Sequence, residues 1–369
     1  MRYYIIAGEA SGDLHAANLV KAIKERDANA TCRGIGGDGM QAAGVELVRH
    51  YRDTAYMGFL EVVLHLRKIL SHIRFCKNDI REWKPDVVIL VDYPGFNLRI
   101  APFAHDLGIK VCYYISPQLW AWKSSRVEII KKYVDKLLVI LPFEEQFYAK
   151  YDYPVTFVGH PLLDAITQFR ENTGFLTAHG LDDKPYIAVL PGSRKQEIRV
   201  KLPIMLSVVD AFPDHQFVVA CAPGLDTAFY TQFGTHPRVQ FIKGATYDIL
   251  QHAHAALVTS GTATLETALF RIPQIVCYKG SAISYQIAKR LVHIRFISLV
   301  NLIADKAVVP ELIQHALTTS NVQEHLQKLI RDTEDRRVML EEYDLLAKTL
   351  GGAGASARAA QEICAFAEA

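Results

Sequence analysis

Short apolar runs alternate with longer amphipathic stretches along the whole chain. Each run has the length of a β-strand, and the stretches between the runs have the spacing of helices. The apolar runs cover residues 3–7, 31–37, 86–92, 110–116, 136–140, 156–161, 186–190, 216–221, 238–242, 255–259 and 273–278. Strands that alternate with helices predict mostly parallel sheets with helices packed on their faces. The chain is therefore predicted to be an α/β protein.

One signal occurs twice, once at the start of each half. The run at residues 3–7 enters the turn Gly8-Glu9-Ala10-Ser11-Gly12-Asp13, and the run at 186–190 enters Pro191-Gly192-Ser193-Arg194. A turn between a strand and a helix directs backbone N–H groups and the positive end of the helix dipole at a bound group. We therefore predict two doubly wound domains that face a cleft. Only the second turn carries an Arg, which favours a phosphate-bearing ligand there.

The domain boundaries follow from changes in composition. The segment 169–184 is polar and contains glycine, as a linker does, so residues 1–165 are assigned to the first domain and 166–349 to the second. Glycines at 351, 352 and 354 interrupt the helical pattern of the second domain. The last helix, within residues 350–369, is expected to pack on the first domain or on a partner chain, which leaves a homodimer open.

Composition excludes several classes of protein. The length of 369 residues suits two hydrophobic cores, and a net charge of +2 argues against binding nucleic acid by bulk electrostatics. The six cysteines form no Cys-x-x-Cys pair, so neither a zinc site nor a disulfide framework is indicated. No signal peptide is expected, because the chain enters a strand at once. No uncharged apolar run reaches the roughly 18 residues of a membrane span, so a cytoplasmic protein is expected.

Polar residues just after the strands are the candidates for chemistry, because ligands of open parallel sheets bind beyond the carboxyl ends of the strands. In the first half these residues are Glu9, Ser11, Asp13, Asp92, Asn97 and Ser116. Asp92 is the strongest candidate acid, since it ends a buried apolar run. As a general base it would have a pKa raised by partial burial. A helix cap or turn-former is the alternative interpretation.

In the second half the corresponding residues are Ser193, Arg194, Ser260, Thr262 and Glu266. The guanidinium of Arg194 matches phosphate oxygens, but a salt bridge to Glu197 competes with that role. The turn around Ser260 is a second glycine-containing helix entry that offers N–H groups and hydroxyls. Glu266 then caps its helix or accepts hydrogen bonds from ribose hydroxyls.

A helix predicted near residues 56–70 is apolar around much of its circumference and leads into a basic stretch. It is either a buried core helix or an interfacial helix that contacts acyl chains while its cations meet anionic headgroups. Its candidate contact residues are Met57, Phe59, Val62, Val63, Leu66, Arg67, Lys68 and Leu70.

The segment Gly34-Ile35-Gly36-Gly37-Asp38-Gly39 superficially matches a dinucleotide-binding fingerprint. It follows the second strand rather than the first, and no acidic residue ends a strand at the proper distance after it. An oxidoreductase is therefore disfavoured.

Ten short motifs occur in an order that identifies a family. Single motifs such as Pro-Gly-Ser-Arg have little specificity, but the ordered set covers nearly the whole chain. It consists of Gly8-Glu9-Ala10-Ser11-Gly12-Asp13, Met57-Gly58, Asp92-Tyr93-Pro94-Gly95-Phe96-Asn97, Ser116-Pro117-Gln118-Leu119-Trp120-Ala121-Trp122, Leu141-Pro142-Phe143-Glu144, Gly159-His160-Pro161, Pro191-Gly192-Ser193-Arg194, Ser260-Gly261-Thr262-Ala263-Thr264-Leu265-Glu266, Asn301-Leu302-Ile303-Ala304 and Val309-Pro310-Glu311-Leu312. The set resembles the lipid-A-disaccharide synthases. Val300 stands where the family often has Pro.

The resemblance implies a glycosyltransferase of the GT-B fold, with two Rossmann-like domains. Such enzymes transfer 2,3-diacylglucosamine from its UDP conjugate to 2,3-diacylglucosamine 1-phosphate (lipid X). The products are a β-1,6-linked tetraacyl disaccharide 1-phosphate and UDP, in the biosynthesis of lipid A. The resemblance also implies a peripheral location at the inner face of the inner membrane of a Gram-negative bacterium.

The resemblance and the reaction suggest roles for the candidate residues. Asp92 is expected to be the base or its orienting carboxylate, with Glu9, Ser11 and Asp13 on the acceptor side. The UDP group is expected to meet Gly192, Ser193, Arg194, Ser260, Gly261 and Thr262, with Glu266 at the ribose and Asn301 and Glu311 lining the cleft. Neither a metal ion nor another cofactor is expected, because GT-B enzymes use helix dipoles and cations at the diphosphate.

Two other functions are alternatives to this one. Another UDP-sugar enzyme of the same fold, such as a UDP-N-acetylglucosamine 2-epimerase, would leave the basic and apolar helix unexplained. A non-catalytic protein that binds a nucleotide sugar or a lipid would not need an acid at Asp92 opposite an Arg-bearing turn.

Overall fold

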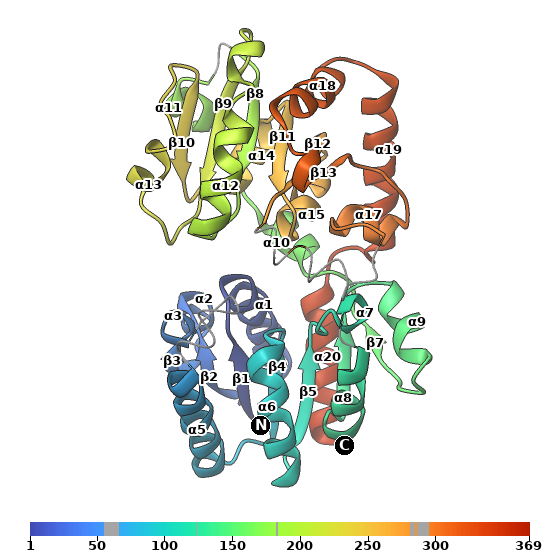
Figure 1. The fold of residues 1–369 in the computed structure, drawn as a ribbon. Coiled ribbons are helices and arrows are strands. Elements are labelled where there is room, and N and C mark those ends of the chain that lie inside the picture. The colour runs from blue at the N-terminus through green and yellow to red at the C-terminus, as the bar shows by residue number, and fades with distance from the viewer. Residues whose placement is uncertain (55–65, 123, 182–183, 281–284, 286–294) are drawn as a thin grey trace. The chain divides into compact units, whose positions relative to one another are not determined.

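The computed structural model of the chain describes residues 1–54, 66–122, 124–181, 184–280, 285 and 295–369. The chain divides into two compact units, drawn in Figure 1. The first unit combines Met1–Asp164 with Leu350–Ala369, and the second is Ala165–Thr349. Each unit is built on its own parallel sheet.

The first unit contains a seven-stranded parallel sheet with the order β3-β2-β1-β4-β5-β6-β7. The strand order reverses between β1 and β4, so this pair forms the topological switch point at which such sheets bind ligands. The strands are β1 (Arg2–Ala7), β2 (Thr31–Gly36), β3 (Glu46–His50), β4 (Val87–Val91), β5 (Lys110–Tyr114), β6 (Lys136–Val139) and β7 (Thr156–Phe157).

Helices cover both faces of this sheet (Figure 1). They are α1 (Ala10–Arg26), α2 (Asp38–Ala42), α3 (Tyr51–Thr54), α5 (Leu66–Trp83), α6 (Pro94–Asp106), α7 (Leu119–Trp122), α8 (Val127–Tyr133), α9 (Phe143–Ala149) and α20 (Ala355–Glu368). Alternate strand residues such as Tyr4 and Ile6 share one core with α5 and α6. Tyr3 faces the other way, and its hydroxyl lies 3.8 Å from the thiol of Cys364 on α20. This alternation explains why the central strands are apolar on both sides.

The last helix, α20, packs on the first unit of its own chain, against α1 and β5. The Asp164 carboxylate accepts hydrogen bonds from the backbone N–H groups of Gly354, Ala355 and Ser356, at 2.5, 3.2 and 2.8 Å. An acceptor in this place satisfies N–H groups that the first turn of a helix leaves unpaired. Asp164, the last residue of the segment Met1–Asp164, thus holds the start of α20 on the first unit.

The second unit contains a six-stranded parallel sheet with the order β10-β9-β8-β11-β12-β13. Its strand order reverses between β8 and β11. The strands are β8 (Tyr186–Leu190), β9 (Gln216–Cys221), β10 (Val239–Lys243), β11 (Ala255–Thr259), β12 (Gln274–Tyr278) and β13 (Glu311–Ile313). The helices that surround them are α10 (Leu162–Gln168), which enters from the first unit, α11 (Phe175–His179), α12 (Lys195–Leu206), α13 (Thr227–Thr231), α14 (Thr246–His252), α15 (Thr262–Leu269), α17 (Leu299–Ala304), α18 (Thr319–Leu329) and α19 (Glu334–Thr349).

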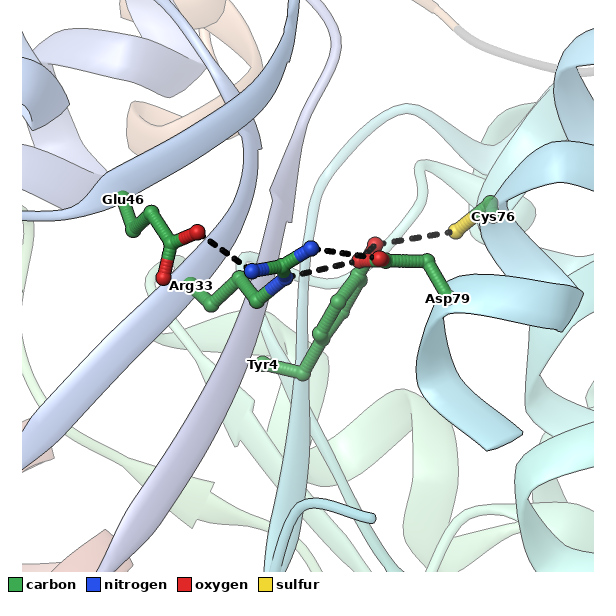
Figure 2. A network of polar contacts seen from close by, with 5 residues as sticks. All are labelled: Tyr4, Arg33, Glu46, Cys76 and Asp79. Carbon is green, nitrogen blue, oxygen red and sulfur yellow. Dashed lines mark hydrogen bonds and ion pairs between the residues drawn. The ribbon is translucent and has the colours of Figure 1, made fainter. Parts of the chain in front are cut away.

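A polar network fixes α5 to the sheet of the first unit (Figure 2). The Asp79 carboxylate on α5 accepts from the Tyr4 hydroxyl at 2.9 Å and from two nitrogens of Arg33, at 2.7 and 3.1 Å. Arg33 also pairs with the exposed Glu46. Tyr4 is fully buried and Asp79 is nearly so, which makes Asp79 the one carboxylate that satisfies both groups in this network.

We expect Asp79→Asn to lower the free energy of unfolding of the first unit by about 2–3 kcal/mol, because it leaves Arg33 half-buried without its inner charge partner. Glu46→Gln removes the outer partner of the same guanidinium and should cost no more than about 0.5 kcal/mol, because the Glu46 carboxylate is exposed. Urea denaturation followed by tryptophan fluorescence measures both, since Trp83, Trp120 and Trp122 all belong to the first unit. Equal effects of the two substitutions would contradict the assignment.

Candidate active site

Two acidic residues follow the switch-point strands of the first unit. Ala7 of β1 pairs with Val91 of β4, so the chain leaves both strands at the same level. Glu9 then lies at the N-cap position of α1, and Asp92 follows Val91 directly. Because β1 and β4 are neighbours paired up to Ala7 and Val91, both acidic residues leave the sheet at the same edge, and the charge of Glu9 contributes to the raised pKa of Asp92. Ser11, in the first turn of α1, is exposed.

The backbone at Asp92 has an unusual conformation. Asp92 and Tyr93 both have positive φ angles, of 45° and 49°, a region that side chains with a Cβ rarely occupy. The Asp92 carbonyl accepts hydrogen bonds from the Asn97 amide at 2.7 Å and from the Tyr113 hydroxyl at 2.6 Å. The Asp92 N–H donates to the Tyr114 carbonyl at 3.1 Å. These bonds hold the strained turn from which the carboxylate projects.

Gly8 allows the two switch-point turns to approach each other. A Cβ at this position would lie 2.2 Å from the Tyr93 ring, a distance that requires the ring to move. The Tyr93 ring also stacks on Phe96, with centroids 5.5 Å apart. The glycine of the first turn is thus required by packing against the turn that carries Asp92.

Burial, followed by the charge of Glu9, raises the pKa of the Asp92 carboxyl to about 7, although a backbone hydrogen bond from Tyr93 lowers it. A carboxyl that titrates near neutral pH is suited to act as a general base. Burial likewise raises the pKa of Glu144 to about 8, and the charge of Asp92 contributes to this rise. Glu144 accepts from the N–H groups of Ile140 and Leu141, at 3.2 and 3.0 Å. Glu144 closes the Leu-Pro-Phe-Glu motif, but the motif alone predicted no role for its carboxyl.

Asp13 is buried and braces the neighbouring turn. Its carboxylate accepts from the N–H groups of Gly37, Gly39 and Met40, at 2.7, 2.9 and 3.0 Å. Both oxygens are therefore occupied at the start of α2. Asp13 therefore supports the loop after β2.

Two helices begin at the switch point of the second unit. Leu190 of β8 pairs with Val258 of β11, and the turns that follow lead into α12 and α15. The turns bring together Gly192, Ser193, Arg194, Ser260, Gly261 and Thr262, of which Ser193, Arg194, Gly261 and Thr262 are exposed. Two helix N-termini at adjacent strand ends provide N–H groups and favourable dipoles for an anion.

The salt bridge that competes with phosphate for Arg194 is present. Its Nη1 lies 3.2 Å from Oε1 of Glu197, and the Arg194 side chain is 58% exposed. An exposed pair of this kind contributes about 0–1 kcal/mol, so a doubly charged ligand can displace it. Ser260 donates to the carbonyl of Ile297 at 2.8 Å, which ties the second turn to that segment. The buried hydroxyl of Thr259, which sequence reasoning left out, has no hydrogen-bond partner among the described residues.

Glu266 lies on α15 and accepts from the Tyr247 hydroxyl at 3.1 Å. Burial raises the pKa of its carboxyl, while the bond from Tyr247 lowers it. It does not cap the helix, whose N-cap is Gly261. The first turns of α15 therefore present a half-buried carboxyl beside an aromatic hydroxyl.

Asn301 and Glu311 form an internal network. The Asn301 amide donates to Glu311 at 2.9 Å and to the Val309 carbonyl at 2.9 Å. Glu311 also accepts from the backbone N–H groups of Ile297 and Ser298, at 3.0 and 2.9 Å. The two residues thus join the segment before α17 to the segment before β13. Ser260 is also bonded to the segment before α17, through the carbonyl of Ile297.

Comparison with known proteins shows the family. The family model described as Lipid-A-disaccharide synthetase matches residues 3–363. The lipid-A-disaccharide synthase of Syntrophus aciditrophicus (strain SB) is 43% identical over 364 residues, which cover 96% of this chain and 95% of that protein. The chain belongs to the lipid-A-disaccharide synthase family. It is a glycosyltransferase that forms the lipid A disaccharide, as the ordered motifs predicted.

Solved structures with the same fold confirm the predicted GT-B architecture of two Rossmann-like domains. A putative UDP-N-acetylglucosamine 2-epimerase from Listeria monocytogenes superposes with a TM-score of 0.68 at 12% identity, covering 100% of this chain and 96% of that chain. The calicheamicin glycosyltransferase superposes with a TM-score of 0.62 at 18% identity, covering 99% and 97%. At such identities the likeness shows the fold alone. The match to the lipid-A-disaccharide synthase family, rather than the fold, decides against an epimerase and against a non-catalytic binding protein.

The residues predicted to contact acyl chains or the membrane lie partly outside the described residues and partly in the first turns of α5. Met57, Phe59, Val62 and Val63 lie outside the described residues, and Leu66 is the first residue of α5. Arg67, Lys68 and Leu70 are exposed on α5, and Leu70 keeps 52% of its surface. Of the helices in the described part of this family member, none has the length and apolar character needed to cross a bilayer.

Proposed function

We propose that this member of the family transfers 2,3-diacylglucosamine from UDP-2,3-diacylglucosamine to 2,3-diacylglucosamine 1-phosphate. The products are the β-1,6-linked tetraacyl disaccharide 1-phosphate and UDP. An α-linked donor that gives a β-linkage reacts with inversion, in a single displacement. Such a step needs a base for the acceptor hydroxyl and stabilisation of the departing diphosphate.

The observation that carries the proposal is the position of Asp92 at the switch point of the first sheet, with its pKa raised to about 7. In the proposed step, the Asp92 carboxylate removes the proton from the acceptor 6-hydroxyl as that oxygen attacks the anomeric carbon. Glu9 and Ser11 contribute to the acceptor side. The bonds from Asn97 and Tyr113 to the Asp92 carbonyl support a fixed direction of attack.

The donor is assigned to the second unit. Arg194 and the N–H groups at the starts of α12 and α15 neutralise the diphosphate, and the hydroxyls of Ser193, Ser260 and Thr262 add hydrogen bonds. The backbone of Gly192 and Gly261 permits close approach of the phosphates. These cations and dipoles supply the stabilisation that the leaving group needs, so we propose that the reaction proceeds without a metal ion.

Glu266 is assigned to the ribose, because a carboxylate accepts bonds from two adjacent hydroxyls. Asn301 and Glu311 are assigned a supporting role, since their polar atoms already bond the segments around Ile297 and Val309. The bond from Ser260 to Ile297 connects these segments to the turn between β11 and α15.

The reaction is tested by incubating the purified protein with UDP-2,3-diacylglucosamine and lipid X in the presence of EDTA, with products identified by mass spectrometry. We expect the tetraacyl disaccharide 1-phosphate together with stoichiometric UDP. UDP without the disaccharide would contradict the assigned acceptor. Activity that disappears with EDTA and returns with a divalent cation would contradict the metal-independent step.

We further propose that the protein binds the inner face of the inner membrane through the segment that leads into α5. The triple variant Val62→Ser, Leu66→Ser, Leu70→Ser should reduce sedimentation with anionic liposomes at least about fivefold and raise the apparent KM, because it removes apolar contact with acyl chains. Leu345→Ser is the control, since Leu345 has the same 52% exposure as Leu70 but lies on α19. Unchanged liposome binding by the triple variant would assign the segment to the protein core.

A further inference from the structure

A lysine is buried beneath the turn that begins α12. Lys201 keeps only 1% of its side-chain surface, and its ammonium lies 3.4 Å from Oε2 of Glu197, one helical turn earlier. In the described part of the chain, Glu197 is the acidic residue that pairs with it. Burial lowers the pKa of Lys201, and the charge of Glu197 raises it. A buried ammonium costs free energy that an apolar side chain of the same length would not, so its charge requires an explanation.

Glu197 lies between two cations. Its Oε1 faces Arg194 at 3.2 Å, and its Oε2 faces Lys201 at 3.4 Å. The same carboxylate packs against the turn itself, because a Cβ on Gly192 would lie 2.7 Å from Oε2. The Gly192 backbone has a positive φ of 104°, so this close approach coincides with a conformation that favours glycine.

This position creates an electrostatic conflict. A carboxylate in the first turn of a helix is favoured by the helix dipole, but here it lies where a diphosphate is expected to bind. Alone, Glu197 would repel the phosphates and neutralise Arg194. The neighbouring thiol of Cys277 and hydroxyl of Tyr278 remain neutral at pH 7, since burial raises the pKa of each. Neither group adds a further negative charge.

We propose that Lys201 is a positioning residue for the donor site: its buried ammonium neutralises Glu197, so that Arg194 keeps its charge for the diphosphate of UDP. The three side chains then carry a net charge of about +1 at the turn instead of zero. The inference rests on the proposed function, because it takes UDP as the ligand of this turn. Lys201 would contact no ligand itself, but it would set the affinity of Arg194 for UDP.

The test is a double-mutant cycle on UDP binding, measured by isothermal titration calorimetry with the full-length protein. Lys201→Met replaces the buried side chain with an unbranched apolar one of nearly the same length and removes its charge. It should weaken UDP binding about tenfold, because Glu197 then neutralises Arg194. The double variant Lys201→Met, Glu197→Gln should recover affinity to within about threefold of the wild type, since no carboxylate remains to compete. Circular dichroism and the midpoint of thermal unfolding establish that each variant is folded.

Two further variants keep the proposal falsifiable. Glu197→Gln alone should bind UDP at least as tightly as the wild type, because Arg194 loses its competitor. Lys328→Met is the matched control: Lys328 also pairs with a glutamate four residues earlier on a helix, but that pair is exposed on α18. It should leave UDP affinity unchanged.

The UDP affinities of the wild type and the variants distinguish a wrong donor from a wrong role of Lys201. If the wild-type protein does not bind UDP, the proposed donor is wrong and the role of Lys201 falls with it. If the wild type binds UDP but Lys201→Met binds equally well, the role of Lys201 alone is overturned. The same holds if the double variant binds no better than Lys201→Met, because Glu197 would then orient Arg194 rather than compete for it.

Discussion

Replacing Asp92 with Asn is expected to lower kcat about a thousandfold while the protein stays folded, because the amide cannot accept the proton of the acceptor hydroxyl. Asn keeps the size of the side chain, and the bonds from Asn97 and Tyr113 go to the Asp92 carbonyl rather than to its carboxylate. KM for both substrates should therefore change little. Steady-state kinetics, with the disaccharide product quantified by mass spectrometry, measure the effect.

Asp86→Asn provides the control for this substitution. Asp86 precedes β4 as Asp92 follows it, is also half-buried, and accepts from the Arg2 N–H at 2.7 Å at the opposite edge of the sheet. Its replacement should leave kcat within about twofold of the wild type, because ligands bind at the carboxyl edge. If Asp92→Asn kept near-wild-type turnover with normal folding, Asp92 would not be the base.

The pH dependence has a definite sign. A base must be deprotonated to act, so kcat/KM should fall as the pH drops below the Asp92 pKa of about 7. Glu9→Gln removes the charge that contributes to this raised pKa and should move the acid limb to lower pH, whatever its effect on the maximal rate. An acid limb that stays in place in this variant would contradict the coupling of the two carboxylates.

The same pKa shift affects folding stability. The Asp92 pKa is higher in the folded protein than its ordinary value of 3.8, so ionisation is penalised in the folded state. That penalty is absent below the ordinary value, grows as the pH rises between 3.8 and about 7, and is fully present above that range. Asp92→Asn should therefore be at least as stable as the wild type at pH 8. Such a result would support the proposal that the carboxylate serves the reaction rather than the fold.

The central strands could be predicted because burial on both faces makes each of them a continuous apolar run in the sequence. β1, β4, β8 and β11 are buried along nearly their entire length, so each reads as a continuous apolar run. β3 and β13 were not predicted. β3 contains Glu46, Arg49 and His50 at the edge of its sheet, and β13 has only three residues. Pairing with a neighbouring strand, rather than local composition, makes both of them strands.

The candidate site could be located from the sequence but not resolved into roles. The rule that ligands bind beyond strand ends selected Glu9, Asp92 and Arg194, and all three follow switch-point strands. The role of Asp13 depends on N–H groups more than 20 residues away in the chain, which no local pattern indicates. Lys201 has the position of an ordinary surface residue in a helix, and only the packing of α12 shows that it is buried.

Replacing Arg194 with Met is expected to lower kcat/KM for the UDP donor about 100-fold to 1,000-fold, the effect of losing one strong donor to a developing anion. The loss should appear in kcat as well as in KM, because charge builds on the diphosphate as the sugar departs. Arg194→Lys keeps the charge but not the planar pair of donors, so it should recover only part of the activity.

The control is Arg199→Met on the same helix. Arg199 is exposed and lies over the Phe229 ring at 5.7 Å, away from Glu197, so its removal changes the charge of α12 without changing the turn. Activity within about twofold of the wild type is expected, since exposed charges are screened by salt. If Arg199→Met and Arg194→Met caused equal losses, the donor site would depend on the overall charge of α12. An effect confined to Arg194 would instead assign the departing diphosphate to the turn between β8 and α12, where Lys201 and Glu197 set the charge that Arg194 presents.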